Sequence, residues 1–271
     1  MRLADDLRGA RDRGETLVVP YLLVDRSRRR SLPATVGALR QAGATALELG
    51  FPFSDPIADG PVLETAHEHA LTDGTRWSDL LSASRVASAV LPTAVMTYAN
   101  PLVRRGLDRA LGELAAAGAT GLIVPDLSFE ESAPFRTVAR RRGLDLVLFA
   151  APGISPERLR RIARASRGFL YLVSHYGTTG GVKRGSTVDL RPLVRSAHRA
   201  APALPVLLGF GVRDRTSAEV ALATGADGVI VGTALEEQLR HDPRPASVRR
   251  FLSQVAAARR SPPTGRSPVA P

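Results

Sequence analysis

The sequence lacks cysteine altogether and contains a single lysine, Lys183, among 37 lysine and arginine residues. Without cysteine the chain has no disulfide bonds, no thiolate nucleophile and no thiolate metal ligand. Aldolases that form an imine, and enzymes that hold pyridoxal phosphate covalently, need a lysine amine at the active centre. Lys183 instead lies in a glycine-flanked segment, residues 180–185, which is typical of a surface loop. Carbon chemistry in this chain is therefore expected to depend on acid and base groups.

Long apolar runs are also missing from the sequence. No run reaches the roughly 18 residues that a membrane helix needs, so we expect no membrane span. The first residues, Met-Arg-Leu-Ala-Asp-Asp-Leu, lack the hydrophobic region of a secretory signal. This beginning favours a cytoplasmic location.

The net charge of +11 does not by itself indicate nucleic-acid binding. Proteins that bind nucleic acid usually concentrate basic residues on one face or in one tail. Here the basic residues form short, scattered clusters at positions 28–30, 140–142 and 249–250. The charge therefore predicts solvated helix surfaces, and we expect no nucleic-acid partner.

Short β-like runs alternate with longer amphipathic stretches along the 271 residues. The predicted strands are 16–24, 44–49, 93–97, 121–124, 145–149, 169–173, 206–208 and 228–231. The predicted helices are 32–42, 77–90, 107–117, 131–142, 156–165, 190–200 and 217–224, one after Thr233, and one over 244–260. Eight alternations in a chain of this length predict a (β/α)8 TIM barrel. A doubly wound open sheet is the alternative, but its glycine fingerprint after the first strand is absent.

The domain organisation follows from the same pattern. Residues 1–260 are expected to form a single catalytic barrel domain. Residues 261–271 are rich in proline and contain too few large apolar residues to pack, so they predict a disordered tail.

Two carboxylates stand out around the second predicted strand. Glu48 lies near the end of an otherwise apolar run, and Asp59 lies in the turn-rich segment that follows it. A charged side chain inside an apolar strand is costly to bury unless it is paired or functional. The pattern favours two acid/base groups directed into one pocket. The alternative is a loop of turn formers beside a strand glutamate that reaches solvent.

Other side chains are expected at the same rim of the barrel. Tyr98 follows the third predicted strand, Asp126 follows the fourth, and Tyr171 falls within the sixth. The active site of such a barrel lies at the carboxyl ends of its strands. A tyrosine at this spacing is equally typical of a core aromatic whose hydroxyl reaches the rim. Asp126 is interpreted as a residue that caps a turn.

The loops after the seventh and eighth strands predict a phosphate site. Gly211 belongs to a Gly-Phe-Gly sequence after the seventh strand, and Gly232 and Thr233 follow the eighth strand and begin a helix. Glycine permits close backbone approach, and a helix N-terminus offers free N–H groups to an anion. Gly180, in the sixth loop, is a third candidate contact. Many barrel enzymes share this pattern, so it indicates a phosphate but not a reaction.

Residues 47–61 read Leu-Glu-Leu-Gly-Phe-Pro-Phe-Ser-Asp-Pro-Ile-Ala-Asp-Gly-Pro, which closely resembles the signature of the tryptophan synthase alpha chain family. Later landmarks of that family have counterparts in the same order. They are Met-Thr-Tyr-Ala-Asn-Pro at 96–101, Val-Pro-Asp-Leu at 124–127, Tyr-Leu-Val-Ser at 171–174 and Gly-Phe-Gly-Val at 209–212. The resemblance extends from about Pro20 to about Leu239.

The resemblance implies the reversible retro-aldol cleavage of indole-3-glycerol phosphate to indole and glyceraldehyde 3-phosphate, with neither a metal nor an organic cofactor. Glu48 matches the family's general acid/base, and Asp59 matches the carboxylate that accepts the indole N–H. The residues expected to contact the rest of the substrate are Tyr21, Met96, Tyr98, Tyr171, Thr179 and Phe210. The resemblance also implies a separate beta subunit that holds pyridoxal phosphate, in an alpha2beta2 complex.

Two segments depart from the family pattern. Residues 23–28 read Leu-Val-Asp-Arg-Ser-Arg where the family usually has Thr-Ala-Gly-Asp-Pro, and His175-Tyr176 replaces an arginine and a small residue. These departures leave open a stand-alone lyase that releases free indole for another pathway. A catalytically weak paralogue with a binding role and another sugar-phosphate barrel enzyme are further alternatives. The intact Glu48 and Asp59 argue against the paralogue.

Overall fold

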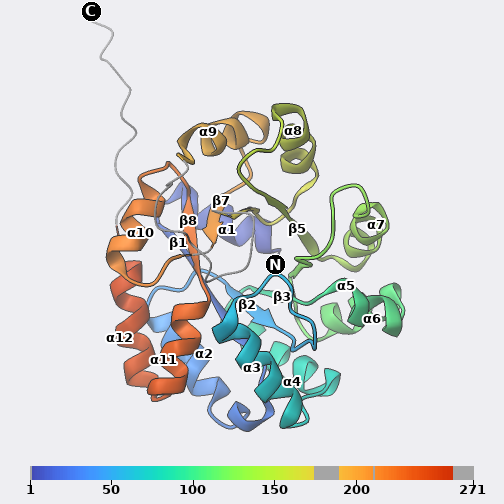
Figure 1. Cartoon of the computed structure of the whole chain (residues 1–271), viewed down its shortest axis with the longest axis vertical. Helices are drawn as coiled ribbons and strands as arrows, with labels where there is room; N and C mark the ends of the chain where they lie inside the picture. Colours follow the sequence, from blue (N-terminus) through green and yellow to red (C-terminus); the bar gives the residue numbers. More distant parts are fainter. Residues whose placement is uncertain (1, 174–188, 210, 259–271) are drawn as a thin grey trace, which may run out of the picture.

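A computed structural model of the chain describes residues 2–173, 189–209 and 211–258. Eight parallel strands form a closed barrel in sequence order, because β1 pairs with β2 on one side and with β8 on the other (Figure 1). This closure excludes the open doubly wound sheet and confirms the predicted TIM barrel. The predicted contacts at Thr179, Gly180 and Phe210, and the predicted tail at 261–271, lie outside the described residues.

The strands are short, and most of their side chains are buried. Their bounds are β1 Leu17–Leu23, β2 Leu47–Gly50, β3 Thr93–Met96, β4 Gly121–Ile123, β5 Asp145–Ala150, β6 Leu170–Val173, β7 Val206–Gly209 and β8 Gly228–Val231. Strands covered on both faces are expected to be apolar throughout rather than alternating. The sequence prediction located all eight, with boundaries that differ by three residues at most.

Helices surround the barrel (Figure 1). Their bounds are α1 Leu3–Asp12, α2 Leu32–Gln41, α3 Pro61–Thr72, α4 Trp77–Ser88, α5 Ala99–Arg105, α6 Leu107–Ala116, α7 Ala133–Arg142, α8 Pro156–Ala165, α9 Arg191–Ala200, α10 Arg215–Leu222, α11 Thr233–His241 and α12 Pro245–Ala256. Within the described part of the chain, no helix is long and apolar enough to cross a membrane.

Helix α1 closes the amino-terminal end of the barrel. Leu3 and Leu7 are fully buried and belong to the same apolar cluster as Leu17, Phe169 and other residues of the barrel interior. The backbone N–H of Ala4 donates a hydrogen bond of 2.9 Å to the carboxylate of Asp145, the first residue of β5. The opposite rim, at the carboxyl ends of the strands, is where polar side chains gather.

Three helices were not predicted from the sequence: α1, α3 and α5. The important one is α3, because the segment after β2 was read as turn-rich throughout. Pro61 occupies the first turn of α3 directly after Gly60, a position where its missing N–H costs nothing. Leu63, Ala66 and Ala70 form its buried face at helical spacing. The carboxylate-bearing loop is therefore tied to a helix immediately after Asp59.

Candidate active site

Glu48 is a buried carboxyl group with no hydrogen-bond partner in the part of the chain that the structure describes. It lies in β2 opposite Tyr21 of β1 and is only 1% exposed. Among the described residues, no donor reaches either of its carboxyl oxygens. Burial, and after it the negative charge of Asp59, raises the pKa of Glu48 from 4.5 to about 8. Glu48 therefore carries its proton at neutral pH, and no described residue pairs with it.

Asp59 lies beside Glu48 in a different setting. It is 3% exposed, and the Tyr98 hydroxyl donates a hydrogen bond of 2.8 Å to its Oδ2. The Tyr98 hydroxyl in turn accepts a hydrogen bond of 3.1 Å from the backbone N–H of Ala58. The His67 Nε2 lies 3.4 Å from the same Oδ2. A neutral hydroxyl thus holds this carboxylate, with the His67 ring nearby, while no donor within the described part of the chain reaches Glu48.

The tyrosines gather around this carboxyl pair. Of the four tyrosines in the chain, the three within the described residues are Tyr21, Tyr98 and Tyr171, and all three are buried. Burial, reinforced by the charge of Asp59, raises the pKa of each phenol well above its ordinary value, and the charge of Glu48 adds to this effect at Tyr21 and Tyr171. Each hydroxyl therefore keeps its proton. Three of the predicted substrate contacts consequently surround Glu48 and Asp59 as neutral aromatic groups.

Glycines at two strand ends leave room for these rings. A Cβ atom on Gly50, at the end of β2, would lie 2.2 Å from the Tyr21 hydroxyl oxygen. A Cβ atom on Gly209, at the end of β7, would lie 2.2 Å from a ring carbon of Tyr171. Any larger residue would displace the tyrosine. Met96 packs against the apolar clusters of both tyrosines and so lies on the wall between them.

The predicted phosphate contacts that the structure describes follow two neighbouring strands. Gly211 comes after β7 and has a φ of 90°, a conformation that favours glycine. Gly232 comes after β8 and is the N-cap of α11, where no side chain caps the helix. Because β7 and β8 pair directly, both loops open at the same rim. The amide groups at the beginning of α11, from Thr233 onward, suit an anion.

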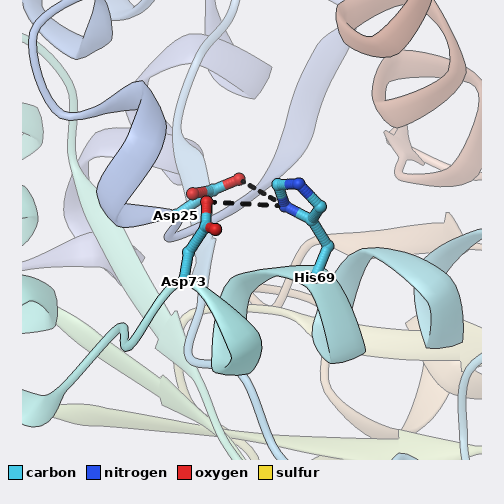
Figure 2. Close-up of side chains that lie close together, drawn as sticks. All are labelled: Asp25, His69 and Asp73. Atoms are coloured by element: carbon cyan, nitrogen blue, oxygen red, sulfur yellow. Dashed lines mark ion pairs between the residues drawn. The ribbon is translucent and has the colours of Figure 1, made fainter.

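A second group of charged residues lies beside the loop after β1. Figure 2 shows the carboxylates of Asp25 and Asp73 close together on one side of the His69 ring, with Nδ1 at 3.5 Å and 3.8 Å from their Oδ2 atoms. Arg28 donates two hydrogen bonds, of 2.8 Å and 2.6 Å, to the carboxylate of Glu236 on α11. We call Asp25, Arg28, His69, Asp73 and Glu236 the first-loop brace.

The first-loop brace includes the set of described residues whose geometry would suit a metal ion. The ligand atoms of Asp25, His69 and Asp73 lie within 4.8 Å of one another. However, the Arg28 Nε lies 3.7 Å from the same Asp25 oxygen that faces His69. A guanidinium already balances this carboxylate, so ion pairing accounts for the arrangement. We therefore interpret the brace as the anchor of the remodelled first loop.

The structure also settles the interpretation of Asp126 and reveals residues that the sequence did not. Asp126 accepts a hydrogen bond of 2.9 Å from the backbone N–H of Ala99, the first residue of α5, so its described side-chain bond goes to the beginning of a helix from another loop and not to the predicted turn. His67 was missed because α3 was not predicted. Its position on the same helical face as Leu63 and Ala70 was the available signal. No sequence signal connected Arg28 with Glu236.

A parallel barrel with a buried acid, an adjacent carboxylate and neutral tyrosines at the carboxyl ends of its strands defines an acid–base enzyme of the TIM-barrel class. The particular family follows from comparison with known proteins. The sequence matches the family described as tryptophan synthase alpha chain over residues 7–260. The chain belongs to this family.

Individual relatives agree over nearly the whole length. The tryptophan synthase alpha chain of Chloroflexus aurantiacus is 40% identical, over 94% of this chain and 98% of that one. The one from Synechococcus elongatus is 38% identical, over 88% of this chain and 90% of that one. A structure of Mycobacterium tuberculosis tryptophan synthase has a TM-score of 0.85 at 36% identity and covers 96% of this chain and 99% of that one. A structure of the tryptophan synthase a2b2 complex of Pyrococcus furiosus has a TM-score of 0.78 at 32% identity. The match covers 89% of this chain and 98% of that one.

Proposed function

We infer that this protein is the alpha subunit of tryptophan synthase. It cleaves indole-3-glycerol phosphate reversibly to indole and glyceraldehyde 3-phosphate, as a carbon–carbon lyase of tryptophan biosynthesis. Membership of the family supports this function. The single structural observation that carries it is the buried, unpaired Glu48 beside the hydrogen-bonded Asp59.

Glu48 supplies the proton for cleavage in this proposal. Its raised pKa, about 8, keeps the carboxyl group protonated at neutral pH, as a general acid requires. The proton goes to the indole ring carbon that bears the side chain. The resulting carboxylate then takes the proton of the adjacent side-chain hydroxyl as the carbon–carbon bond breaks and the aldehyde forms. The bond electrons return to the ring, which leaves as indole, and Glu48 ends the cycle protonated.

Asp59 stabilises the positive charge that develops on the ring. Protonation of the ring carbon converts the indole to a cationic indolenine, whose N–H becomes a strong donor. A fixed carboxylate facing that N–H lowers the energy of the intermediate in a site that excludes water. Tyr98 holds Oδ2 of Asp59, and the other oxygen would accept the indole N–H. The aromatic rings of Tyr21, Tyr98 and Tyr171 would contact the flat indole.

The glycerol phosphate end would bind at the loops after β7 and β8. Gly211, Gly232 and Thr233 are the proposed contacts within the described residues, and Gly180 is a fourth from the sixth loop. Replacing Gly211 by valine should raise KM for the substrate much more than it lowers the melting temperature. Equal affinity for phosphorylated and dephosphorylated substrate would contradict this site.

A beta subunit is the expected partner, and a cytoplasmic location is the expected setting. The solved relative from Pyrococcus furiosus is described as an a2b2 complex. In the same arrangement, this chain would pass indole to a beta subunit that carries pyridoxal phosphate. A stand-alone lyase that releases free indole is not favoured, because the relatives named above are tryptophan synthase chains.

A cleavage assay on indole-3-glycerol phosphate, with and without a beta subunit, tests the proposed function directly. Indole and glyceraldehyde 3-phosphate should form in equal amounts, and the beta subunit should accelerate their formation. No cleavage under either condition would overturn the proposal. Full activity alone, with no complex detected by size-exclusion chromatography, would instead establish the stand-alone lyase.

A further inference from the structure

His67 is a buried histidine at the centre of the site that the mechanism above does not use. It lies on α3, is 2% exposed, and faces Asp59 and Tyr21. A buried imidazole needs partners for both ring nitrogens. Each nitrogen of His67 has one, and the two nitrogens contact different parts of the site.

The backbone fixes which ring nitrogen carries the proton. The N–H of Phe53, in the loop after β2, donates a hydrogen bond of 3.0 Å to the His67 Nδ1. An N–H group cannot accept, so Nδ1 is the unprotonated nitrogen and the proton of the neutral ring lies on Nε2. The backbone amide therefore selects the tautomer, and His67 is a donor toward the catalytic side.

The donor nitrogen faces two residues of the proposed active site. Nε2 lies 3.4 Å from Oδ2 of Asp59 and 3.4 Å from the hydroxyl oxygen of Tyr21. The Tyr98 hydroxyl reaches the same Asp59 oxygen from another direction. Among the described residues, no donor contacts the other oxygen, Oδ1. The described contacts of this carboxylate are consequently at Oδ2.

These contacts form a closed ring of residues. Phe53 binds His67 through its backbone and stacks on Tyr98 through its side chain, with ring centroids 5.0 Å apart. Tyr98 binds Asp59, and Asp59 contacts His67. The loop after β2, the end of β3 and helix α3 thus meet at one carboxylate. A shift of the Phe53 backbone would be transmitted to Asp59 through the imidazole.

We propose that His67 is a positioning residue for the cleavage reaction: its ring, tied at Nδ1 to the Phe53 backbone, places Nε2 against Tyr21 and 3.4 Å from Oδ2 of Asp59, and so keeps the Asp59 carboxylate where the indole N–H will lie. This inference rests on the proposed function, because it assigns His67 to the carboxylate that the substrate contacts. His67 transfers no proton, since its Nδ1 is occupied by a backbone donor. Its contribution is the direction and the distance of the Asp59 oxygen atoms.

Three substitutions separate the two contacts of His67. Glutamine places its amide at the position of Nε2 and keeps the contact with Asp59. Asparagine reaches the position of Nδ1 and accepts from Phe53, but its amide is too short to reach Asp59. Leucine makes neither contact. Misplacing a catalytic group by about 1 Å costs roughly 100-fold, so His67→Leu and His67→Asn should each lower kcat by roughly 10- to 100-fold, with KM changed much less. His67→Gln should retain most of the activity.

The pH profile distinguishes positioning from a purely structural role. The charge of Asp59 contributes to the raised pKa of Glu48, and the other titratable groups around the pair are the phenols of Tyr21, Tyr98 and Tyr171. If Asp59 moves away, the fall in kcat at basic pH should shift toward lower pH in His67→Leu and His67→Asn. Loss of fold stability alone would lower the melting temperature but would not change the pH at which kcat falls on the basic side of the profile.

His69→Leu is the matched control, because His69 lies on the exposed face of the same helix and its described ion-pair contacts are with Asp25 and Asp73 of the first-loop brace. It should leave kcat and the pH profile unchanged.

If His67→Leu does not fold, the asparagine and glutamine variants decide alone, and equal activity of these two would overturn the proposal. Wild-type kcat and an unshifted basic limb in His67→Leu would also overturn it. A wild-type protein that does not cleave the substrate would refute the proposed function instead.

Discussion

Two equally buried glutamates of this protein lie in opposite environments. Glu48 is 1% exposed and Glu236 is 2% exposed. Glu236 accepts two hydrogen bonds from Arg28, whereas Glu48 has no hydrogen-bond partner among the described residues. A buried carboxylate is stable as an ion only when it is paired, and otherwise it takes up a proton. The comparison shows that pairing, rather than burial, separates the carboxyl group that anchors a loop from the one available for proton transfer.

The two regions also differ in the kind of residue that supports them. The first-loop brace relies on a guanidinium and on histidine–carboxylate contacts at a partly exposed edge. The Glu48 and Asp59 region relies on neutral groups, namely the Tyr98 hydroxyl, which donates to Asp59, and the His67 ring, which lies 3.4 Å from it. Positive groups beside Glu48 would lower its pKa and remove the acid. The absence of described cations from its immediate contacts is therefore consistent with its proposed role.

The largest effect should come from removing the unpaired acid. Glu48→Gln keeps the shape of the side chain but transfers no proton, so kcat for cleavage should fall by roughly 100-fold or more. Asp59→Asn should also be severe, because the cationic ring loses its counter-charge. Steady-state assays of indole formation measure both effects. Glu236→Gln with Arg28 intact is the control, and it should affect stability much more than kcat.

Breaking the paired glutamate should produce the next largest effect, on stability. Arg28→Leu leaves Glu236 buried without its partner, which should cost about 2 kcal/mol of unfolding free energy, less than for a fully buried pair because Arg28 is partly exposed. The double variant Arg28→Leu/Glu236→Leu should recover most of the loss. Urea unfolding of the three proteins checks this. An equal loss of unfolding free energy in the single and the double variant would show that the unpaired Glu236 does not cause the destabilisation.

The raised pKa of Glu48 predicts a pH dependence. The acid form is the active one, so kcat should decline as pH rises through about 8. For stability the sign follows from linkage: the folded pKa lies above the ordinary value of 4.5, so the contribution of Glu48 is fully present below that value and is lost as pH rises through about 8. Glu48→Gln should therefore gain in melting temperature relative to the wild type between about pH 5 and about pH 9. A difference in melting temperature between the two proteins that stays constant with pH would contradict the raised pKa of Glu48.

The smallest effect concerns the beta subunit. Pro52 and Asp55 remain in the loop that touches the beta subunit in the family, so a complex should form. The first and sixth loops depart from the family pattern, and activation requires differential contacts with the closed state. We therefore expect a beta subunit to accelerate cleavage by a smaller factor than in typical members. Titration of a beta subunit into the cleavage assay measures the factor, and a stimulation as large as in typical members would show that these loops do not limit coupling.

Much of the fold was predictable because its signals are local. Each strand is a short apolar run followed by a helical stretch, and these features follow from neighbouring residues. The two helices around the catalytic segment, α3 and α5, were harder to predict. Helix α5 is short, and α3 begins at Gly60-Pro61, which reads as a turn when only the neighbouring residues are considered. Missing α3 also concealed His67, although Glu48 and Asp59 were both identified.

The sequence by itself determined the barrel class, the eight strands and the pair of candidate catalytic carboxylates, because strand patterning and the motif at 47–61 are contained in contiguous residues. Only the tertiary structure decided which buried acid is paired and which is free. Arg28 reaches Glu236 across 208 positions because β1 pairs with β8 and closes the barrel. His67 reaches Asp59 because α3 folds back over the rim. The protonation of a buried group depends on all charges and donors around it in space, and no local pattern contains that information.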